Sequence, residues 1–151
     1  MTETIHAFIG EWDFLSNYYP APVPLDGDLY PSVEHAYQAA KTEDAGWREQ
    51  IREAPDPDEA KRLGRASPHR ADWDQVKLPL MRELVGAKFR DSVLRERFMA
   101  TGDAILVEGN DWGDTFWGSC NGQGANHMGV ILMDLRARLR GEAVGDAKML
   151  T

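Results

Sequence analysis

Three helix-start signals in the first half of the chain constrain its fold more than any other feature. Asp56 is followed by Pro57 and Glu59, which is the order of an N-cap residue, a proline at the first helical position and a capping-box acid. Ser32 and Asp72 precede two further helical patterns as candidate N-caps. A chain with three such starts close together is expected to be mainly helical.

The spacing of apolar residues extends these starts into short elements. Gly64 is a candidate helix stop and Pro79 a candidate kink, while Asp26-Gly27 suits the turn of a hairpin. We expect helices over residues 33–44, 47–54, 56–64, 73–87, 92–100 and 128–139, strands over 5–8 and 104–107, a hairpin over 23–30 and a long irregular segment over 109–127. These elements predict one α+β domain over residues 1–140, mainly helical with a small β-sheet, followed by a frayed tail over residues 141–151.

Composition limits the partners. The 151 residues suit a single domain, and 25 acidic against 17 basic side chains give a formal net charge of −8. The first 40 residues contain no Lys or Arg, which disfavours long electrostatic contact with DNA but leaves room for a local phosphate site. Cys120 is the only cysteine, so no intramolecular disulfide forms. Without a signal-like start or roughly 18 consecutive apolar residues, we expect a soluble, cytoplasmic protein with no membrane partner.

An aromatic cluster runs from Phe14 to Pro20 and includes Ser16 and Asn17. Such a cluster is compatible with a loop packed on the core. Because polar side chains stand beside aromatic ones, it also suits recognition of a planar, polar ligand. Phe14, Ser16 and Asn17 are therefore candidate substrate-binding residues.

A second cluster places Glu34, Gln38 and Lys41 at positions i, i+4 and i+7 of a predicted helix. This spacing puts the three side chains on one helix face, and an acid in the first turn is favoured by the helix dipole. The face is either solvated or part of a site. His35 points about 100° away from Glu34 and is interpreted as structural.

A third cluster contains Arg65, Arg70 and Trp73. Arginine at a helix end is compatible with simple capping, but guanidinium groups also bind phosphate in a bidentate manner. With Lys61 or Lys77, the two arginines would form a phosphate clamp. Trp73 is either a core residue or a platform on which a base stacks.

The glycine-rich segment after residue 108 is the least ordinary part of the chain. It contains Asp111, Asp114 and Trp117 among five glycines, and glycine allows the backbone to approach a ligand closely. Its pattern matches neither of the common nucleotide-binding glycine loops. The four histidines are scattered, so we expect no metal and no cofactor.

Taken together, these clusters resemble the NADAR, or YbiA-like, family. The matching strings occur in order over about residues 8–139, and the ordered set is much more specific than any one string. They are Phe14-Leu-Ser-Asn-Tyr-Tyr-Pro20, Asp26-Gly27, Tyr30-Pro-Ser-Val-Glu-His-Ala-Tyr-Gln-Ala-Ala-Lys41, Ala60-Lys-Arg-Leu-Gly-Arg65, Asp72-Trp73, Lys88-Phe89, Leu106-Val-Glu108, Asp114-x-x-Trp117-Gly118 and Gly124-x-Asn126 to Arg136.

The resemblance implies a small, mainly helical α+β domain that cleaves N-glycosidic bonds. Family members are associated with ribosylamino-pyrimidine phosphates of early riboflavin synthesis or with ADP-ribose on guanine in nucleic acid. The resemblance assigns site positions to Glu34, Trp73 and Asp114, with Lys41 in the same pocket. This chain lengthens the loop before Asp114 by residues 111–113, which leaves Asp111 as an alternative acid.

We therefore expect a hydrolase in which Glu34 and Asp114 divide the acid and base roles, because two carboxylates commonly serve an oxocarbenium-like reaction. Lys41 would hold phosphate or attack an opened sugar. The expected substrate-binding residues are Phe14, Ser16, Asn17, Gln38, Arg65, Arg70, Trp73, Trp117, Gly118 and Asn126. The alternative is a non-catalytic module that binds ADP-ribose or a related nucleotide.

Overall fold

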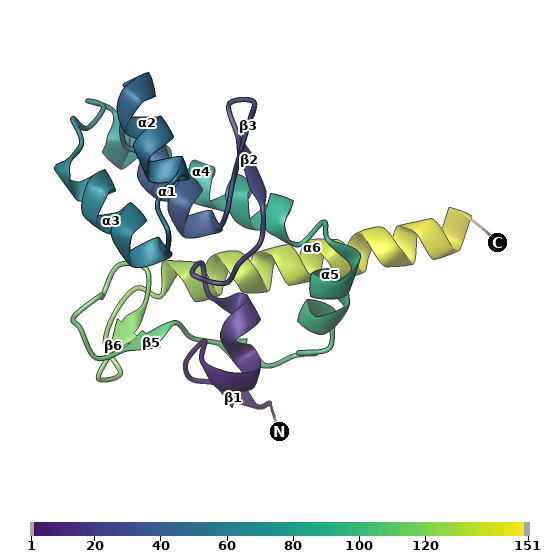
Figure 1. The fold of residues 1–151 in the computed structure, drawn as a ribbon. Coiled ribbons are helices and arrows are strands. Elements are labelled where there is room, and N and C mark those ends of the chain that lie inside the picture. Colours follow the sequence, from purple (N-terminus) through teal and green to yellow (C-terminus); the bar gives the residue numbers. More distant parts are fainter. Residues whose placement is uncertain (1, 150–151) are drawn as a thin grey trace. The chain divides into compact units, whose positions relative to one another are not determined.

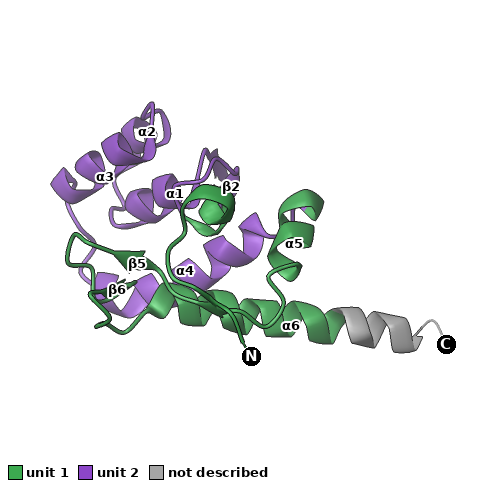
Figure 2. Ribbon diagram, turned by 90° about the horizontal axis from the view of Figure 1, so that it is seen from below, with its two compact units in different colours: residues 1–16, 92–151 green, residues 17–91 purple. Residues whose placement is uncertain are grey.

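The structure is a computed structural model that describes residues 2–149, with side chains described for residues 2–142. The chain divides into two compact units, one formed by Met1–Ser16 with Ser92–Thr151 and the other by Asn17–Asp91 (Figure 2). Helices dominate both units, which confirms the predicted α+β class. The strands form three separate two-stranded pairs instead of the expected single small sheet.

The unit formed by Asn17–Asp91 is a hairpin with four helices (Figure 1). The hairpin turns at Asp26 and Gly27, whose positive φ angles of 48° and 90° suit the predicted tight turn. Its elements are β2 (Val23–Leu25), β3 (Asp28–Tyr30), α1 (Val33–Ala40), α2 (Ala45–Arg52), α3 (Pro57–Ala66) and α4 (Trp73–Lys88). α1 packs against α2, α3 and α4, so its side chains lie at the centre of this unit.

The three predicted N-cap residues all precede a helix, and two of them make a side-chain cap hydrogen bond. The Ser32 Oγ accepts from the His35 backbone N–H at 3.1 Å, and an Asp56 carboxylate oxygen accepts from the Glu59 N–H at 2.8 Å. Asp72 is the N-cap residue of α4, as predicted, but its side chain accepts no hydrogen bond from an N–H of that helix. Its carboxylate instead accepts from the Arg70 Nε at 2.6 Å.

The predicted helix stop at Gly64 is wrong. α3 continues through Gly64 to Ala66, and Ser67 follows as its C-cap. A Cβ atom at position 64 would lie 2.7 Å from the Gln38 Cβ and closer still to the Gln38 Oε1. Glycine therefore serves the close packing of α3 on α1, not the end of the helix.

The other unit contains the N-terminal and C-terminal segments. Its elements are β1 (Thr4–Ile5), the 3₁₀ helix η1 (Gly10–Leu15), α5 (Ser92–Met99), β4 (Ile105–Leu106), β5 (Gly109–Asn110), β6 (Ser119–Cys120) and α6 (His127–Met149). β1 pairs with β4, and β5 pairs with β6, both in parallel. The segment expected to be irregular over residues 109–127 thus contains two short strands.

The buried Arg136 of α6 connects this helix to the segment between α5 and β4. Its guanidinium donates to the Thr101 Oγ1 at 2.8 Å and to the Ala104 carbonyl at 2.7 Å. The expected frayed tail over residues 141–151 stays a prediction, because side chains from residue 143 onward lie outside the described residues. Within the described part of the chain, no helix is both long and apolar enough to cross a bilayer.

Candidate functional site

The shared face of α1 is the centre of the candidate site. Ser32 starts the helix, and the spacing then places Glu34, Gln38 and Lys41 on one side, as predicted. Glu34 is only 8% exposed and Gln38 only 2%, so the alternative of a solvated face is wrong. The Gln38 Nε2 donates to the Glu34 Oε1 at 2.7 Å.

The Glu34 carboxyl is subject to opposing influences on its pKa. Burial raises the pKa of Glu34. The hydrogen bond from Gln38 and the charges of Lys61, Lys41 and Arg65 oppose this rise. A carboxyl whose pKa is raised keeps its proton to higher pH than an exposed glutamate does.

Lys41 lies at the C-cap of α1, where its environment disfavours the charged amine. Burial lowers the pKa of Lys41, and the nearby cations Arg65, Lys61 and Lys77 lower it further, while Glu34 acts in the opposite direction. The Nζ atom lies 5.3 Å from the centroid of the Tyr37 ring.

Trp73 is the first residue of α4 and is half-buried. Its ring packs against Tyr37, with the centroids 5.2 Å apart and the planes tilted by 56°. Trp73 is therefore fixed by a core neighbour and still partly accessible, which combines the two alternatives that its sequence position left open. Tyr37, which links Trp73 to Lys41, was not among the predicted site residues.

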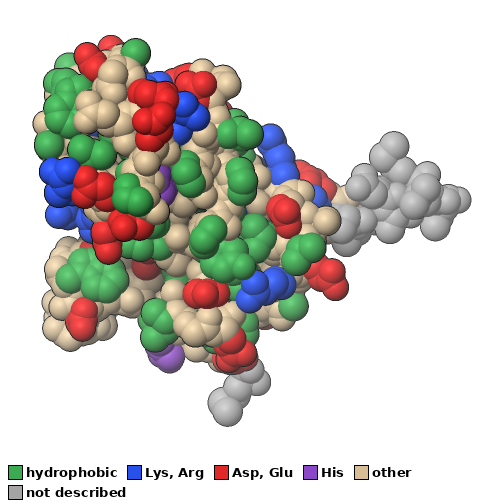
Figure 3. Space-filling model, in the orientation of Figure 1, with side chains coloured by type: hydrophobic (Ala, Val, Ile, Leu, Met, Phe, Trp, Pro, Cys, Tyr) green, Lys and Arg blue, Asp and Glu red, His purple; other side chains and the backbone are tan. Residues whose placement is uncertain are grey.

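The predicted cations differ in how far they are already used. Lys and Arg side chains gather over α3 at the left of Figure 3, and α3 contributes Lys61, Arg62 and Arg65. Among the described residues, no carboxylate lies within 4.0 Å of Lys61 or Arg65. The guanidinium of Arg70, in contrast, pairs with Asp72 at 2.6 Å and with Glu43 at 3.6 Å.

Arg70 therefore has a structural role that was not predicted from the sequence. Its backbone N–H donates to the Lys41 carbonyl at 2.7 Å and so fixes the end of α1. Its side chain is held by two acids, Asp72 and Glu43, whereas no described carboxylate lies within 4.0 Å of Arg65. The signal for this role was the Asp72 two residues later.

Asn17 and Tyr18 border the start of α1. The Asn17 carbonyl accepts from the Glu34 N–H at 3.1 Å, and the buried Asn17 side chain donates to the Met81 sulfur at 3.6 Å. The Tyr18 hydroxyl donates to an Asp58 carboxylate oxygen at 3.0 Å. Burial and the charge of Glu34 both raise the pKa of Tyr18, so this phenol keeps its proton. Tyr18 is a second residue that the sequence prediction missed.

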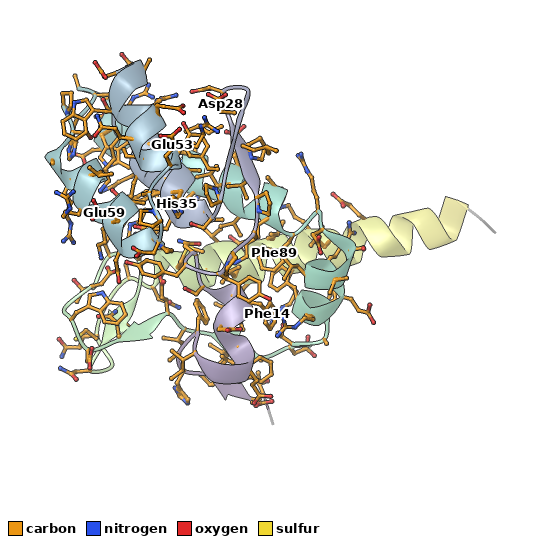
Figure 4. All side chains as sticks on the ribbon, viewed as in Figure 1. Phe14, Asp28, His35, Glu53, Glu59 and Phe89 are labelled. Carbon is orange, nitrogen blue, oxygen red and sulfur yellow. The ribbon has the colours of Figure 1, made fainter. Side chains whose placement is uncertain are left out.

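His35 has the structural role expected of it (Figure 4). It is buried, its Nδ1 lies 2.7 Å from the Ser32 Oγ, and its Nε2 donates to the Ala54 carbonyl at 3.1 Å. These contacts join the start of α1 to the segment after α2.

Phe14 and Ser16 belong to the other unit. The Phe14 ring is 2% exposed and lies 4.3 Å from the Arg97 guanidinium, so core packing is its role in this unit. Ser16 is the half-buried C-cap of η1, and its N–H donates to the Asp13 carbonyl at 2.9 Å.

Asp114 organises the loop that carries it. One of its oxygens, Oδ1, accepts from the backbone N–H groups of Phe116 at 3.1 Å and Trp117 at 2.9 Å. The Asn110 side chain bonds both the N–H and the carbonyl of Asp114, at 3.0 and 2.8 Å. The extra residues form an exposed turn between these two positions, and Trp112 within it is 68% exposed.

Trp117, Gly118 and Asn126 complete this loop. Trp117 packs edge-to-face on Phe116 with centroids 4.8 Å apart. A Cβ at Gly118 would collide with the Glu108 carbonyl, and the Asn126 side chain bonds the Glu108 N–H at 2.9 Å and the Leu106 carbonyl at 3.0 Å. These residues all hold the loop in shape. Among the described residues, no group of three or more His, Cys, Asp or Glu could hold a metal ion.

Comparison with known proteins places this chain in one family. The NADAR domain model matches residues 6–140. The N-glycosidase YbiA of Escherichia coli strain K12 is 38% identical over 146 residues, which cover 92% of this chain and 91% of that protein. An N-glycosidase of Nostoc punctiforme is 42% identical over 132 residues, covering 83% of this chain and 84% of its own.

Two further matches extend the comparison. A riboflavin biosynthesis protein of Vibrio vulnificus is 38% identical over 134 residues, which cover 86% of this chain but 36% of that longer protein. The NMR structure of Escherichia coli YbiA superimposes with a TM-score of 0.82 at 37% identity, over 95% of this chain and 89% of the other. The predicted family and fold are thus confirmed.

Proposed function

The chain belongs to the NADAR domain family, and on that premise we propose that it is an N-glycosidase that hydrolyses the bond between a phosphorylated ribose and a base. Relatives of nearly the same length are named N-glycosidases, and they match over most of the chain. The observation that carries the proposal is the buried Glu34, held by Gln38 and surrounded by cations on α1 and α3.

Cleavage of an N-glycosidic bond develops positive charge on the ribose, and the leaving base needs a proton. An ionised Glu34 would stabilise the ribosyl cation or activate water, and a protonated Glu34 would donate to the base. Burial raises the pKa of this carboxyl, which makes the protonated form easier to populate than in an exposed glutamate. Buried in low dielectric, the charged form acts strongly on a developing cation.

The cations of α3 supply the phosphate-binding part of the proposal. Lys61 and Arg65 lie close enough to affect the pKa of Glu34 and form no ion pair with a described carboxylate. A phosphate group would give them the partner that they lack. Trp73, fixed against Tyr37, offers its remaining surface for stacking on the base.

Lys41 has a second role open to it. Burial and neighbouring cations lower the pKa of Lys41, which favours the neutral amine needed for attack on C1 of an opened ribose. The new C–N bond would form an iminium as the base leaves, and water would then hydrolyse it. Borohydride should trap a covalent adduct with wild-type protein and not with Lys41→Met. Absence of an adduct during active turnover would leave Lys41 with phosphate binding only.

Asp114 is the candidate second carboxylate of this proposal. Its Oδ1 already accepts two backbone N–H groups, so Asp114→Asn keeps an acceptor oxygen for the loop and removes the charge. We expect Asp114→Asn to slow base release if the carboxylate takes part in the reaction. An Asp114→Asn variant with wild-type rates would restrict Asp114 to shaping the loop, and the same test on Asp111→Asn checks the alternative acid.

The preferred substrate is a ribosylamino-pyrimidine phosphate. A riboflavin biosynthesis protein is among the relatives, and the net charge of −8 disfavours a nucleic-acid polymer. The test compares release of free base from this substrate and from ADP-ribosylated guanine DNA under the same conditions. Faster turnover of the DNA substrate would reverse the preference, and tight ADP-ribose binding without base release from either would favour a binding module.

A further inference from the structure

Gly64 is an unusual residue in the interior of α3. Glycine inside a helix is less favourable than alanine by roughly 0.5–1 kcal/mol, so a helical glycine needs a reason. At Gly64 the reason is α1, because a Cβ would lie 2.7 Å from the Gln38 Cβ and 3.0 Å from its Cδ. Gly86 in α4 provides the contrast, since a Cβ there would meet nothing within 4 Å.

The space left by Gly64 is occupied by the Gln38 amide. The Gln38 Oε1 is the atom nearest to the missing side chain, and it has no hydrogen-bond partner among the described residues. The other end of the amide, Nε2, donates to the Glu34 Oε1 at 2.7 Å. The reverse orientation would set two acceptor oxygens against each other, so the ionised carboxylate fixes the direction of the amide.

We infer that Gln38 is a positioning residue that holds the Glu34 carboxyl in place for the reaction and does not itself contact the substrate. The missing side chain of Gly64 leaves the space that the Gln38 amide occupies. Gln38 was predicted to bind substrate, but its side chain is buried with one end on Glu34 and the other against α3. The inference rests on the proposed function of Glu34.

The charged groups around Glu34 allow the role of Gln38 to be separated from theirs. Lys41 faces the carboxyl from α1, Lys61 and Arg65 face it from α3, and Tyr18 lies near enough to respond to its charge. Salt screens these charges to some extent but does not remove a buried hydrogen bond between a neutral amide and the carboxylate. The effect of Gln38 should therefore persist at high salt.

The variant that tests the inference is Gln38→Met, which keeps a similar volume and helix propensity but removes the N–H donor. Loss of one hydrogen bond to a charged group corresponds to an upward shift of about one pH unit in the Glu34 titration. Carbon-13 NMR of the Glu34 carboxyl, assigned by its disappearance in Glu34→Gln, measures this shift directly. The matched control is Gln50→Met, because Gln50 is an exposed glutamine on α2.

Kinetics give the second readout. The limb of the pH–rate profile that reports Glu34 should move to higher pH by the same amount, at low and at high salt, whichever role Glu34 plays. If the reaction requires ionised Glu34, a shift of one pH unit makes the rate about tenfold slower at pH values below the limb. KM should change little, because a positioning residue does not touch substrate.

The outcomes distinguish this inference from the proposed function. An unchanged Glu34 titration in Gln38→Met, or a raised KM with an unchanged pH limb, would overturn the positioning role. Full base release by Glu34→Gln would instead contradict the catalytic assignment of Glu34. In that case the NMR titration would still decide whether Gln38 controls the carboxyl.

Discussion

Replacing Gly64 by alanine should destabilise the protein although it improves helix propensity. Alanine in a helix interior contributes roughly 0.5–1 kcal/mol relative to glycine. Against this, the new Cβ would lie 2.7 Å from the Gln38 Cβ, an overlap that forces α1 and α3 to adjust. Overpacking of this kind costs about 1–3 kcal/mol. Displacing the amide from Glu34 costs a further 1.5–3 kcal/mol or so, typical of a hydrogen bond to a charged group.

The sum is a net loss of about 3 kcal/mol for Gly64→Ala, which is a fall in Tm of roughly 6–12 °C for a chain of this size. Gly86→Ala is the matched control, because it makes the same change in a helix with open space around the new Cβ. We expect it to be more stable than wild type by roughly 0.5–1 kcal/mol.

Urea unfolding of both variants, followed by tryptophan fluorescence and by circular dichroism, measures the two changes in the free energy of unfolding. We expect the dependence of this free energy on urea concentration to be the same for both variants. A Gly64→Ala variant as stable as Gly86→Ala would refute the reasoning. That result would mean that α1 and α3 leave room for a Cβ atom between Gly64 and Gln38.

Three further predictions concern stability. Burial raises the pKa of Glu34 in the folded state, so the protein loses stability as pH rises from the ordinary glutamate pKa through the folded-state pKa. In thermal unfolding, we expect Glu34→Gln to be more stable than wild type at pH 8 and equal to it at low pH. Asp114→Ala should lose about 1 kcal/mol in urea unfolding because two N–H groups lose their acceptor, whereas Asp114→Asn should lose less. Asp56→Ala should lose about 1 kcal/mol as a helix cap, and Asp72→Ala, which removes no cap, should show a smaller effect in the same assay. Equal losses for the last two would contradict the assignment of caps.

Local sequence signals were sufficient for the features that depend on neighbours in the chain. The helix period alone placed Glu34, Gln38 and Lys41 on one face, and Ser32 and Asp56 were correctly identified as caps. Each of these features is decided within one or two helical turns, where spacing and hydrogen-bonding chemistry leave few alternatives.

The predictions that failed did so because another side chain, near or far in the chain, engages the residue concerned. Gly64 was interpreted as a helix stop because glycine is common at helix ends, but its function depends on Gln38 in another helix. Asp72 has the chemistry of a cap, yet its carboxylate pairs with Arg70, a local partner two residues earlier whose effect the capping pattern did not take into account. The burial of the α1 face likewise follows from its packing against α3 and α4, which no period in the sequence expresses.

The loop around Asp114 shows the same limit in a different form. The resemblance to the family predicts Asp114 as a site position, but it did not reveal that this carboxylate accepts hydrogen bonds from two backbone N–H groups. Phe14 was a candidate ligand contact, and only the structure shows its ring buried beside Arg97. Residue type and order suggested which residues matter, while their packing decided what each one does.

The most direct test of the central claim is single-turnover release of free base from a ribosylamino-pyrimidine phosphate by wild type and by Glu34→Gln. Gln38→Met and the exposed Gln50→Met, measured beside them, provide the positioning variant and the neutral control. We expect release by wild type, a loss of at least about 100-fold in the folded Glu34→Gln variant, and no change in Gln50→Met. Equal rates for wild type and Glu34→Gln would contradict the assignment of the reaction to this buried carboxylate.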